Sequence, residues 1–151
     1  ILYAGPRPSA WAEPGWRRVE AATLFAEADF VSLHCPLSPA THHMVDARVL
    51  ATMKSTAILI NTARGGCVDE AALGAAIAAG QIAGAGLDVF AAEPAIHPSL
   101  LASERVVLAP HAGSATRAAR AKMAEICALA VRSVAAGERP PTALNPEVAG
   151  D

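Results

Sequence analysis

Several side chains that can do acid–base chemistry follow apolar runs in this 151-residue chain. His111 comes directly after RVVLAP, Arg64 follows AILINTA, and Glu93 follows GAGLDVFAA. A guanidinium can polarise a bound anion, a carboxylate can orient an imidazole, and the imidazole can donate a proton. If the fold brings Arg64, Glu93 and His111 into one cleft, the sequence therefore predicts proton transfer to an anionic substrate.

The elements that must position these side chains alternate between strands and helices. Strand-length apolar runs are expected at 1–4, 30–33, 57–60, 84–90 and 105–109, and helices at 18–28, 46–53, 69–79 and 114–136. Asp69 and Ser114 are expected to cap the last two helices, and Gly80 and Gly137 to end them. The order predicts an α/β doubly wound parallel sheet, Rossmann-like, with strands buried on both faces.

Ligands of such sheets bind beyond the carboxyl ends of the strands. The predicted strands deliver His34 to Pro36, Asn61 to Arg64, Asp88 and His111 to that edge. A carboxylate such as Asp88, placed at the end of a buried strand, needs a partner. The sequence therefore predicts one ligand site built from segments that are far apart along the chain.

Composition narrows the class of protein. The chain is 53% hydrophobic and 17% charged, and its mean hydropathy of +0.34 is typical of a folded domain. A net charge of −2 with scattered basic residues argues against a nucleic-acid or membrane partner. Three cysteines without a C-x-x-C pair favour reduced thiols and a cytoplasmic location. Histidines 42, 43 and 97 are interpreted as surface residues, and no metal site is expected.

The two ends of the chain suggest a fragment. The opening ILYAGPRPS resembles a strand entered midway, without an initiator methionine. Residues 1–136 are expected to form a partial dinucleotide-binding domain that lacks its first β-α unit. The proline-rich segment 137–151 is expected to be a tail that packs on an absent N-terminal substrate domain.

Four stretches resemble one known family. ADFVSLHCPLSPATHHMVD, STAILINTARGGCVDEAAL, GQIAGAGLDVFAAEP and VVLAPHAGSAT resemble, in order and spacing, the D-isomer-specific 2-hydroxyacid dehydrogenases over residues 19–136. The resemblance implies that Arg64 binds the substrate carboxylate and keto oxygen, and that Glu93 hydrogen-bonds His111, the acid or base. It implies that Asp88 holds the nicotinamide carboxamide, and that the cofactor is lined by Pro36, Thr41, Thr62, Ala63 and Gly113.

The resemblance also implies an activity and a homodimer. The expected reaction is NAD(P)-dependent reduction of a small 2-keto acid to its D-2-hydroxy acid, with glyoxylate or hydroxypyruvate as substrate. Negative charge grows on the carbonyl oxygen during this reaction, so a protonated His111 and Arg64 would stabilise it.

The chain departs from the family pattern at two places. It contains no G-x-G-x-x-G turn for the pyrophosphate, so the 151 residues alone are expected to be inactive. Where NAD users commonly carry an acidic residue for the ribose, this chain has Gly5, and Arg7 and Ser9 could receive a 2′-phosphate. This resembles the glyoxylate and hydroxypyruvate reductase branch and favours NADP over NAD.

Two alternatives stay open. One is an enzyme of the 3-phosphoglycerate dehydrogenase type. The other is a non-catalytic dinucleotide-sensing, corepressor-like module, although a pure sensor would not need the proton donor His111.

Overall fold

The structure is a computed structural model that describes residues 1–10 and 12–145. The chain divides into two compact units, Ile1–His111 and Ala112–Asp151. The expected domain over 1–136 and tail over 137–151 stay predictions, and residues 146–151 of that tail lie outside the described residues.

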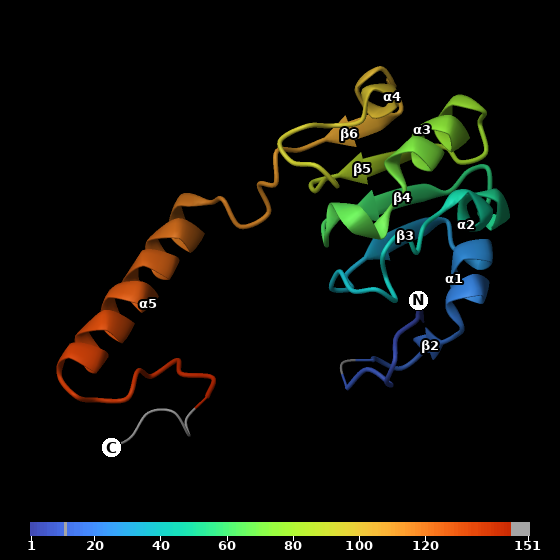
Figure 1. Ribbon diagram of the computed structural model, residues 1–151. Coiled ribbons are helices and arrows are strands. Elements are labelled where there is room, and N and C mark those ends of the chain that lie inside the picture. Colours follow the sequence, from blue (N-terminus) through green and yellow to red (C-terminus); the bar gives the residue numbers. More distant parts are fainter. Residues whose placement is uncertain (11, 146–151) are drawn as a thin grey trace. The chain divides into compact units, whose positions relative to one another are not determined.

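The first unit is built on a parallel sheet of four strands (Figure 1). The strands follow one another in the order β3-β4-β5-β6. Their bounds are Phe30–Leu33, Ile58–Asn61, Gly84–Leu87 and Val106–Leu108. The α/β parallel fold predicted from the apolar runs is confirmed, although β5 ends at Leu87 and not at residue 90.

The helices of this unit pack against one another in chain order. α1 contacts α2, α2 contacts α3 and α3 contacts α4, as expected for successive crossovers of one hand. A single 3₁₀ turn, η1, lies between β4 and α3. The bounds are α1 Ala21–Glu27, α2 Ala47–Thr52, η1 Gly65–Cys67, α3 Glu70–Ala78 and α4 Pro98–Leu101.

The sheet buries one face, most completely along its first three strands. Val31, Leu59 and Leu87 are at most 4% exposed and belong to one hydrophobic cluster with helix residues such as Leu50 and Leu73. Successive side chains point to opposite faces of a strand. On the other face, Phe30 and Val107 are 68% and 75% exposed. The expectation of strands buried on both faces therefore holds, within the described residues, for one face only.

The start of α3 confirms a predicted cap. The Asp69 carboxylate accepts a hydrogen bond from the Ala72 N–H at 3.0 Å, which satisfies one of the unpaired donors of the first turn. Gly80 follows the last turn with φ +70°, the left-handed conformation that glycine adopts at helix ends. Both ends of α3 are therefore fixed by local chemistry.

Of two short strands near the N-terminus, the first lies within the run expected at 1–4 and the second was not predicted. β1 (Leu2–Tyr3) pairs in parallel with β2 (Arg17–Arg18), with Arg17 donating its N–H to the Ile1 carbonyl at 2.9 Å. The helix expected from residue 18 is therefore wrong at its start, and α1 begins at Ala21. Two paired residues leave no periodicity that sequence analysis could detect.

The second unit contains one long helix, α5 (Arg117–Ala135). Its cap is Thr116, whose Oγ1 accepts from the Ala119 N–H at 3.1 Å, and not Ser114 as predicted. Gly137 ends the helix with φ +71°, as expected. The prediction misplaced the cap because Ser114 and Thr116 are both good N-cap residues.

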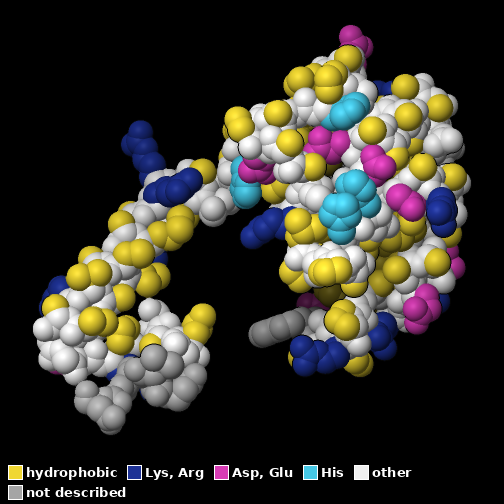
Figure 2. Space-filling model, viewed as in Figure 1, with side chains coloured by type: hydrophobic (Ala, Val, Ile, Leu, Met, Phe, Trp, Pro, Cys, Tyr) yellow, Lys and Arg dark blue, Asp and Glu magenta, His cyan; other side chains and the backbone are white. Residues whose placement is uncertain are grey.

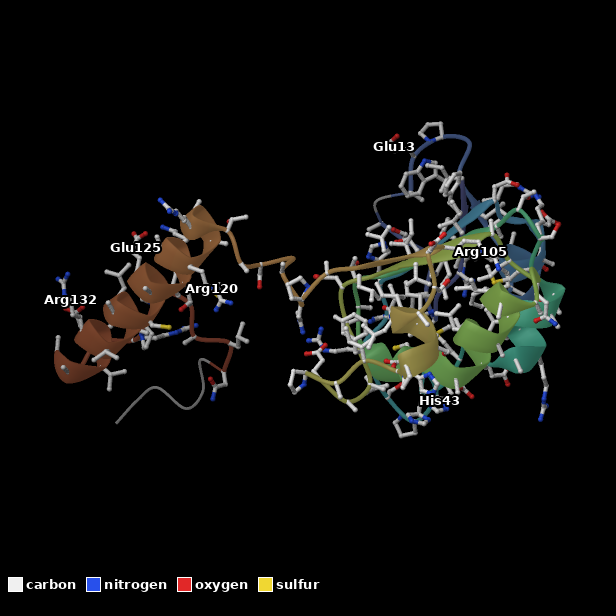
Figure 3. All side chains as sticks on the ribbon, turned by 90° about the horizontal axis from the view of Figure 1, so that it is seen from above. Glu13, His43, Arg105, Arg120, Glu125 and Arg132 are labelled. Carbon is white, nitrogen blue, oxygen red and sulfur yellow. The ribbon has the colours of Figure 1, made fainter. Side chains whose placement is uncertain are left out.

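None of the side chains of α5 is buried. Figure 2 shows hydrophobic side chains along the helix. Met123, Leu129 and Val131 of this helix are exposed. Charged side chains also project from it, and Arg120, Glu125 and Arg132 are labelled in Figure 3. In the described part of the chain, no helix is both long and apolar enough to cross a membrane.

Gly65 offers a test of how η1 packs against the segment that follows β5. A Cβ at Gly65 would overlap the backbone of Phe90 and Ala91, whereas a Cβ at Gly66 would touch only the tip of the Leu37 side chain. We expect Gly65→Ala to lower the free energy of unfolding by about 1–3 kcal/mol.

Urea unfolding of the complete protein measures this change. Gly66→Ala is the matched control, because Leu37 can rotate away, and it should stay close to wild type. Equal losses in the two variants would show that the contact with Phe90 is not what holds η1.

Candidate functional site

The register of the sheet brings the predicted site segments to one edge. Leu33, Asn61, Leu87 and Leu108 are aligned across the four neighbouring strands. Because the strands are parallel, the residues that follow them leave the sheet side by side. These segments are 34–36, 62–64, 88–93 and 109–111.

Glu93 and His111 are in direct contact. Glu93 Oε2 lies 2.9 Å from His111 Nδ1, and Glu93 Oε1 accepts the Phe90 N–H at 3.0 Å. An ionised carboxylate can only accept, so His111 carries a proton on Nδ1. The Nε2 atom is then the position at which the ring can exchange a proton with a substrate. The side chains of His111 and Glu93 are 49% and 37% exposed, so a ligand can reach them.

The same contacts keep Glu93 ionised. The hydrogen bond from His111 lowers the pKa of Glu93 most, the Phe90 N–H lowers it further, and the positive charge of Arg64 acts in the same direction. A carboxylate beside an imidazole stabilises the protonated ring. The negative charge of Glu93 therefore lies next to the His111 ring, where it would stabilise a positive charge on the imidazole.

The backbone of His111 is unusual. Its φ is +55°, in the left-handed region that L residues adopt rarely, although histidine is enriched there. Pro110 precedes it, so the strand ladder cannot continue through this turn. The turn and the hydrogen bond to Glu93 together fix the imidazole.

Arg64 lines a pocket of about 510 Å³, here called the Arg64 pocket. Pro36, Thr62 and Ala63 line it as well, so the structure brings four of the predicted site residues together. The Arg64 side chain is exposed, and its Nη1 donates to the Ala63 carbonyl at 2.6 Å. An exposed guanidinium at a concave surface can bind a carboxylate through two parallel hydrogen bonds.

The turn that carries Arg64 is held by Asn61, which sequence analysis did not assign a role. Asn61 is 1% exposed, its Nδ2 donates to the Arg64 carbonyl at 3.0 Å, and its Oδ1 accepts the Ala63 N–H at 3.0 Å. A polar residue at the end of a buried apolar strand is the feature that could have revealed it.

Thr41 and Asp88 occupy different places at this edge. Thr41 Oγ1 donates to the Pro36 carbonyl at 2.6 Å, so it holds the loop that carries Pro36. Asp88 is half-buried, and its N–H donates to the Asn61 carbonyl at 3.0 Å. Gly113 belongs to the second unit, and its expected role stays a prediction.

Arg7 and Ser9 line a larger pocket of about 1060 Å³, here called the β1–β3 pocket after the strands beside it. His34, Cys35 and Pro36 line both this pocket and the Arg64 pocket, so the two are adjacent. Arg18 Nη2 donates to the Gly5 carbonyl at 2.9 Å, which holds the segment that leads to Arg7. Residue 18 was expected to begin a helix, so sequence analysis missed this contact.

Glu70 fixes the loop that carries Glu93. Its Oε1 accepts the Ala91 N–H at 2.6 Å and its Oε2 accepts the His97 N–H at 3.3 Å. One carboxylate therefore holds the loop on both sides of Glu93, and Glu70 is a positioning residue. An acidic residue in the first turn of α3 is common near the helix dipole, so the sequence carried no distinctive sign of this role.

The hydrogen bond between Glu93 and His111 predicts a measurable titration. Because the pKa of Glu93 is lowered, its contribution to stability is present at neutral pH and is lost as pH falls through the folded-state pKa. In His111→Ala the largest cause of the lowering is removed. We therefore expect the pKa of Glu93 to rise, as measured by carboxyl ¹³C NMR. An unchanged titration would show that Phe90 and Arg64 account for the shift.

Comparison with known proteins identifies related sequences and structures. The sequence pattern of the D-isomer specific 2-hydroxyacid dehydrogenase, NAD binding domain, matches residues 1–113. A glyoxylate reductase of Thermococcus litoralis is 49% identical over 149 residues, which cover 98% of this chain and 45% of that protein. The chain thus spans less than half the length of this relative.

Two solved structures extend the comparison. D-lactate dehydrogenase with NAD+ from Lactobacillus jensenii is 33% identical, with a TM-score of 0.83 over 93% of this chain and 46% of that one. An NADPH-dependent glyoxylate/hydroxypyruvate reductase from Sinorhizobium meliloti, in complex with NADP and malonate, is 34% identical, with a TM-score of 0.81 over 88% and 41%. This chain belongs to the D-isomer-specific 2-hydroxyacid dehydrogenase family, and its residues 1–113 match the family's NAD-binding domain.

Proposed function

We propose that the complete protein is an NAD(P)-dependent oxidoreductase that reduces a small 2-keto acid to its D-2-hydroxy acid, with glyoxylate or hydroxypyruvate as substrate. The observation that carries this proposal is the 2.9 Å hydrogen bond between Glu93 and His111 at the edge of the sheet that also carries Arg64. A site that only senses a dinucleotide has no use for an oriented proton donor beside an exposed guanidinium.

The proposed roles follow from the chemistry of each group. Arg64 binds the substrate carboxylate and stabilises negative charge on the keto oxygen. His111 donates the proton from Nε2 to that oxygen, and Glu93 balances the charge of the imidazolium through Nδ1. The bound coenzyme supplies the hydride. In the reverse direction His111 accepts the proton from the hydroxyl group.

The residues present fit two parts of a dinucleotide. The Arg64 pocket, with Pro36, Thr62 and Ala63, would hold the nicotinamide end, while Arg7 and Ser9 on the adjacent β1–β3 pocket would hold the ribose end. The sequence has no G-x-G-x-x-G turn, so these residues do not include the turn that would bind the pyrophosphate. We accordingly expect the 151 residues by themselves to be inactive.

We propose that NADP is preferred over NAD. The segment after β1 carries Arg7 and Ser9 and no carboxylate to accept a ribose hydroxyl. Arg18 adds a second guanidinium here, 2.9 Å from the Gly5 carbonyl. Two cationic groups near the ribose end favour the 2′-phosphate of NADP over the uncharged 2′-hydroxyl of NAD.

The assembly and location are also proposals. The hydrophobic side chains that α5 exposes, such as Val131 and Val134 at 70% and 65%, need cover in a stable protein. We propose a homodimer for this reason and because of the family, and a cytoplasmic location because the described cysteines form no disulfide.

Steady-state kinetics of the complete protein test the main proposal. Wild type should reduce glyoxylate or hydroxypyruvate with NADPH or NADH. Removing the proton donor in His111→Ala should lower kcat by about 10²–10⁴-fold. His42→Ala is the matched control, because His42 is an exposed histidine of the same unit that lines neither pocket.

Other outcomes separate the alternatives. Turnover of 3-phosphohydroxypyruvate in preference to both smaller acids would favour the 3-phosphoglycerate dehydrogenase type. Tight dinucleotide binding without turnover of any 2-keto acid would overturn the enzyme proposal and favour the sensing module.

Arg7→Ala tests the coenzyme preference. Loss of one charged hydrogen bond to a phosphate should raise the Kd for NADPH about tenfold or more and leave the Kd for NADH nearly unchanged. Coenzyme fluorescence measures both constants. Arg17→Ala is the control, because Arg17 pairs with Glu27 at 3.4 Å and does not line the β1–β3 pocket. A parallel change for both coenzymes would contradict a role for Arg7 in selecting NADPH.

A further inference from the structure

Two cysteines far apart in the sequence lie in contact beside the Arg64 pocket. Cys35 Sγ is 3.8 Å from Cys67 Sγ and 3.5 Å from the sulfur of Met44. Cys35 follows β3, and Cys67 ends η1. A disulfide needs a separation of about 2.05 Å, so the two sulfurs must move closer together before they can bond.

The two thiols differ in access. Cys35 is half-buried and lines both the Arg64 pocket and the β1–β3 pocket, so a small oxidant can reach it through either. Cys67 is fully buried, and burial raises the pKa of its thiol, with the neighbouring Cys35 adding to the effect. Cys35 is therefore the thiol that is oxidised first, and Cys67 lies beside it to form the disulfide.

We propose that Cys35 and Cys67 are a reversible redox site whose disulfide, formed by a peroxide, reshapes the Arg64 pocket. The Cys35 thiolate attacks one oxygen of hydrogen peroxide and breaks the O–O bond, which yields a sulfenic acid and hydroxide. The Cys67 sulfur then attacks the Cys35 sulfur and displaces the second oxygen as water. In total, two thiols lose two electrons and two protons, and one peroxide becomes two waters.

The direction of movement follows from what holds each cysteine. Cys67 is held by the backbone on both sides, because its N–H donates to the Arg64 carbonyl at 3.2 Å and its carbonyl accepts the Val45 N–H at 3.1 Å. The Cys35 side has more freedom, since it belongs to an exposed loop that continues into Pro36. Closing the bond therefore draws Cys35 and Pro36 toward η1. Thr41, whose hydroxyl donates to the Pro36 carbonyl at 2.6 Å, follows or loses that hydrogen bond.

The consequence for ligand binding rests on the proposed function. Pro36 lines both pockets, so its displacement changes the wall at which the coenzyme would bind. Misplacing a positioned group by about 1 Å can lower a reaction rate by as much as a hundredfold. The oxidised protein should therefore bind the dinucleotide more weakly, and a dithiol should restore binding.

Peptide mapping tests the disulfide without reference to activity. The complete protein is treated with hydrogen peroxide, its remaining thiols are alkylated, and it is digested with trypsin without reduction. Cleavage after arginine and lysine places Cys35 in peptide 19–48, Cys67 in peptide 65–105 and Cys127 in peptide 123–132. We expect a linked species of peptides 19–48 and 65–105 that dithiothreitol separates.

Matched variants make the mapping decisive. Cys35→Ser and Cys67→Ser should each abolish the linked species, and Cys127→Ser should retain it, because Cys127 is an exposed cysteine on α5. Cys35 oxidised to a sulfinic acid while Cys67 remains open to alkylation would overturn the proposal. So would two thiols that both stay reduced under peroxide.

Coenzyme binding supplies the second readout, in the Cys127→Ser background. We expect oxidation to raise the Kd for NADPH by roughly tenfold to a hundredfold, with recovery after dithiothreitol and no change in Cys67→Ser. A disulfide that forms without changing Kd would overturn the effect on the pocket. If the reduced protein binds no dinucleotide, the proposed function fails, while the mapping still decides whether the redox site exists.

Discussion

The parallel register of β3, β4, β5 and β6 is the constraint on which the site depends. Leu33, Asn61, Leu87 and Leu108 lie in one row, and every predicted site segment of the sheet leaves it just beyond that row. A slip by one residue would turn each strand over and expose its buried side chains, so the hydrophobic core fixes the register. The chemistry at the edge is therefore positioned by the packing of apolar side chains that take no part in it.

Two polar side chains hold the loops that carry the site residues. Asn61 is buried and holds the turn that carries Arg64, and Glu70 holds the loop that carries Glu93. Each satisfies backbone groups that a loop would otherwise leave unpaired. Because both side chains are fixed to regular elements, Arg64 and Glu93 are presented by rigid turns. Such supporting contacts are what keep a proton donor and an anion-binding group in a constant geometry.

The sequence predicted the parts of the fold that depend on local patterns. The four strands of the main sheet and the cap at Asp69 follow from apolar runs and capping chemistry. Strand β2 was missed because it has only two residues, whereas β1 lies within the strand expected at 1–4. The contacts of Glu70 and the approach of Cys35 to Cys67 were also missed, because they join residues whose proximity only the folded chain creates. The pairing of Glu93 with His111 was expected through the family resemblance, and the structure shows the contact.

In the proposed mechanism Glu93 acts through His111. A double-mutant cycle on kcat/KM of the complete protein, using Glu93→Gln and His111→Ala, measures this coupling. We predict that Glu93→Gln lowers kcat/KM in the wild-type background by about 10–100-fold, and that it has almost no further effect once His111 is absent. Independent losses that multiply in the double variant would show that the two side chains act separately, and would overturn the proposed role of Glu93.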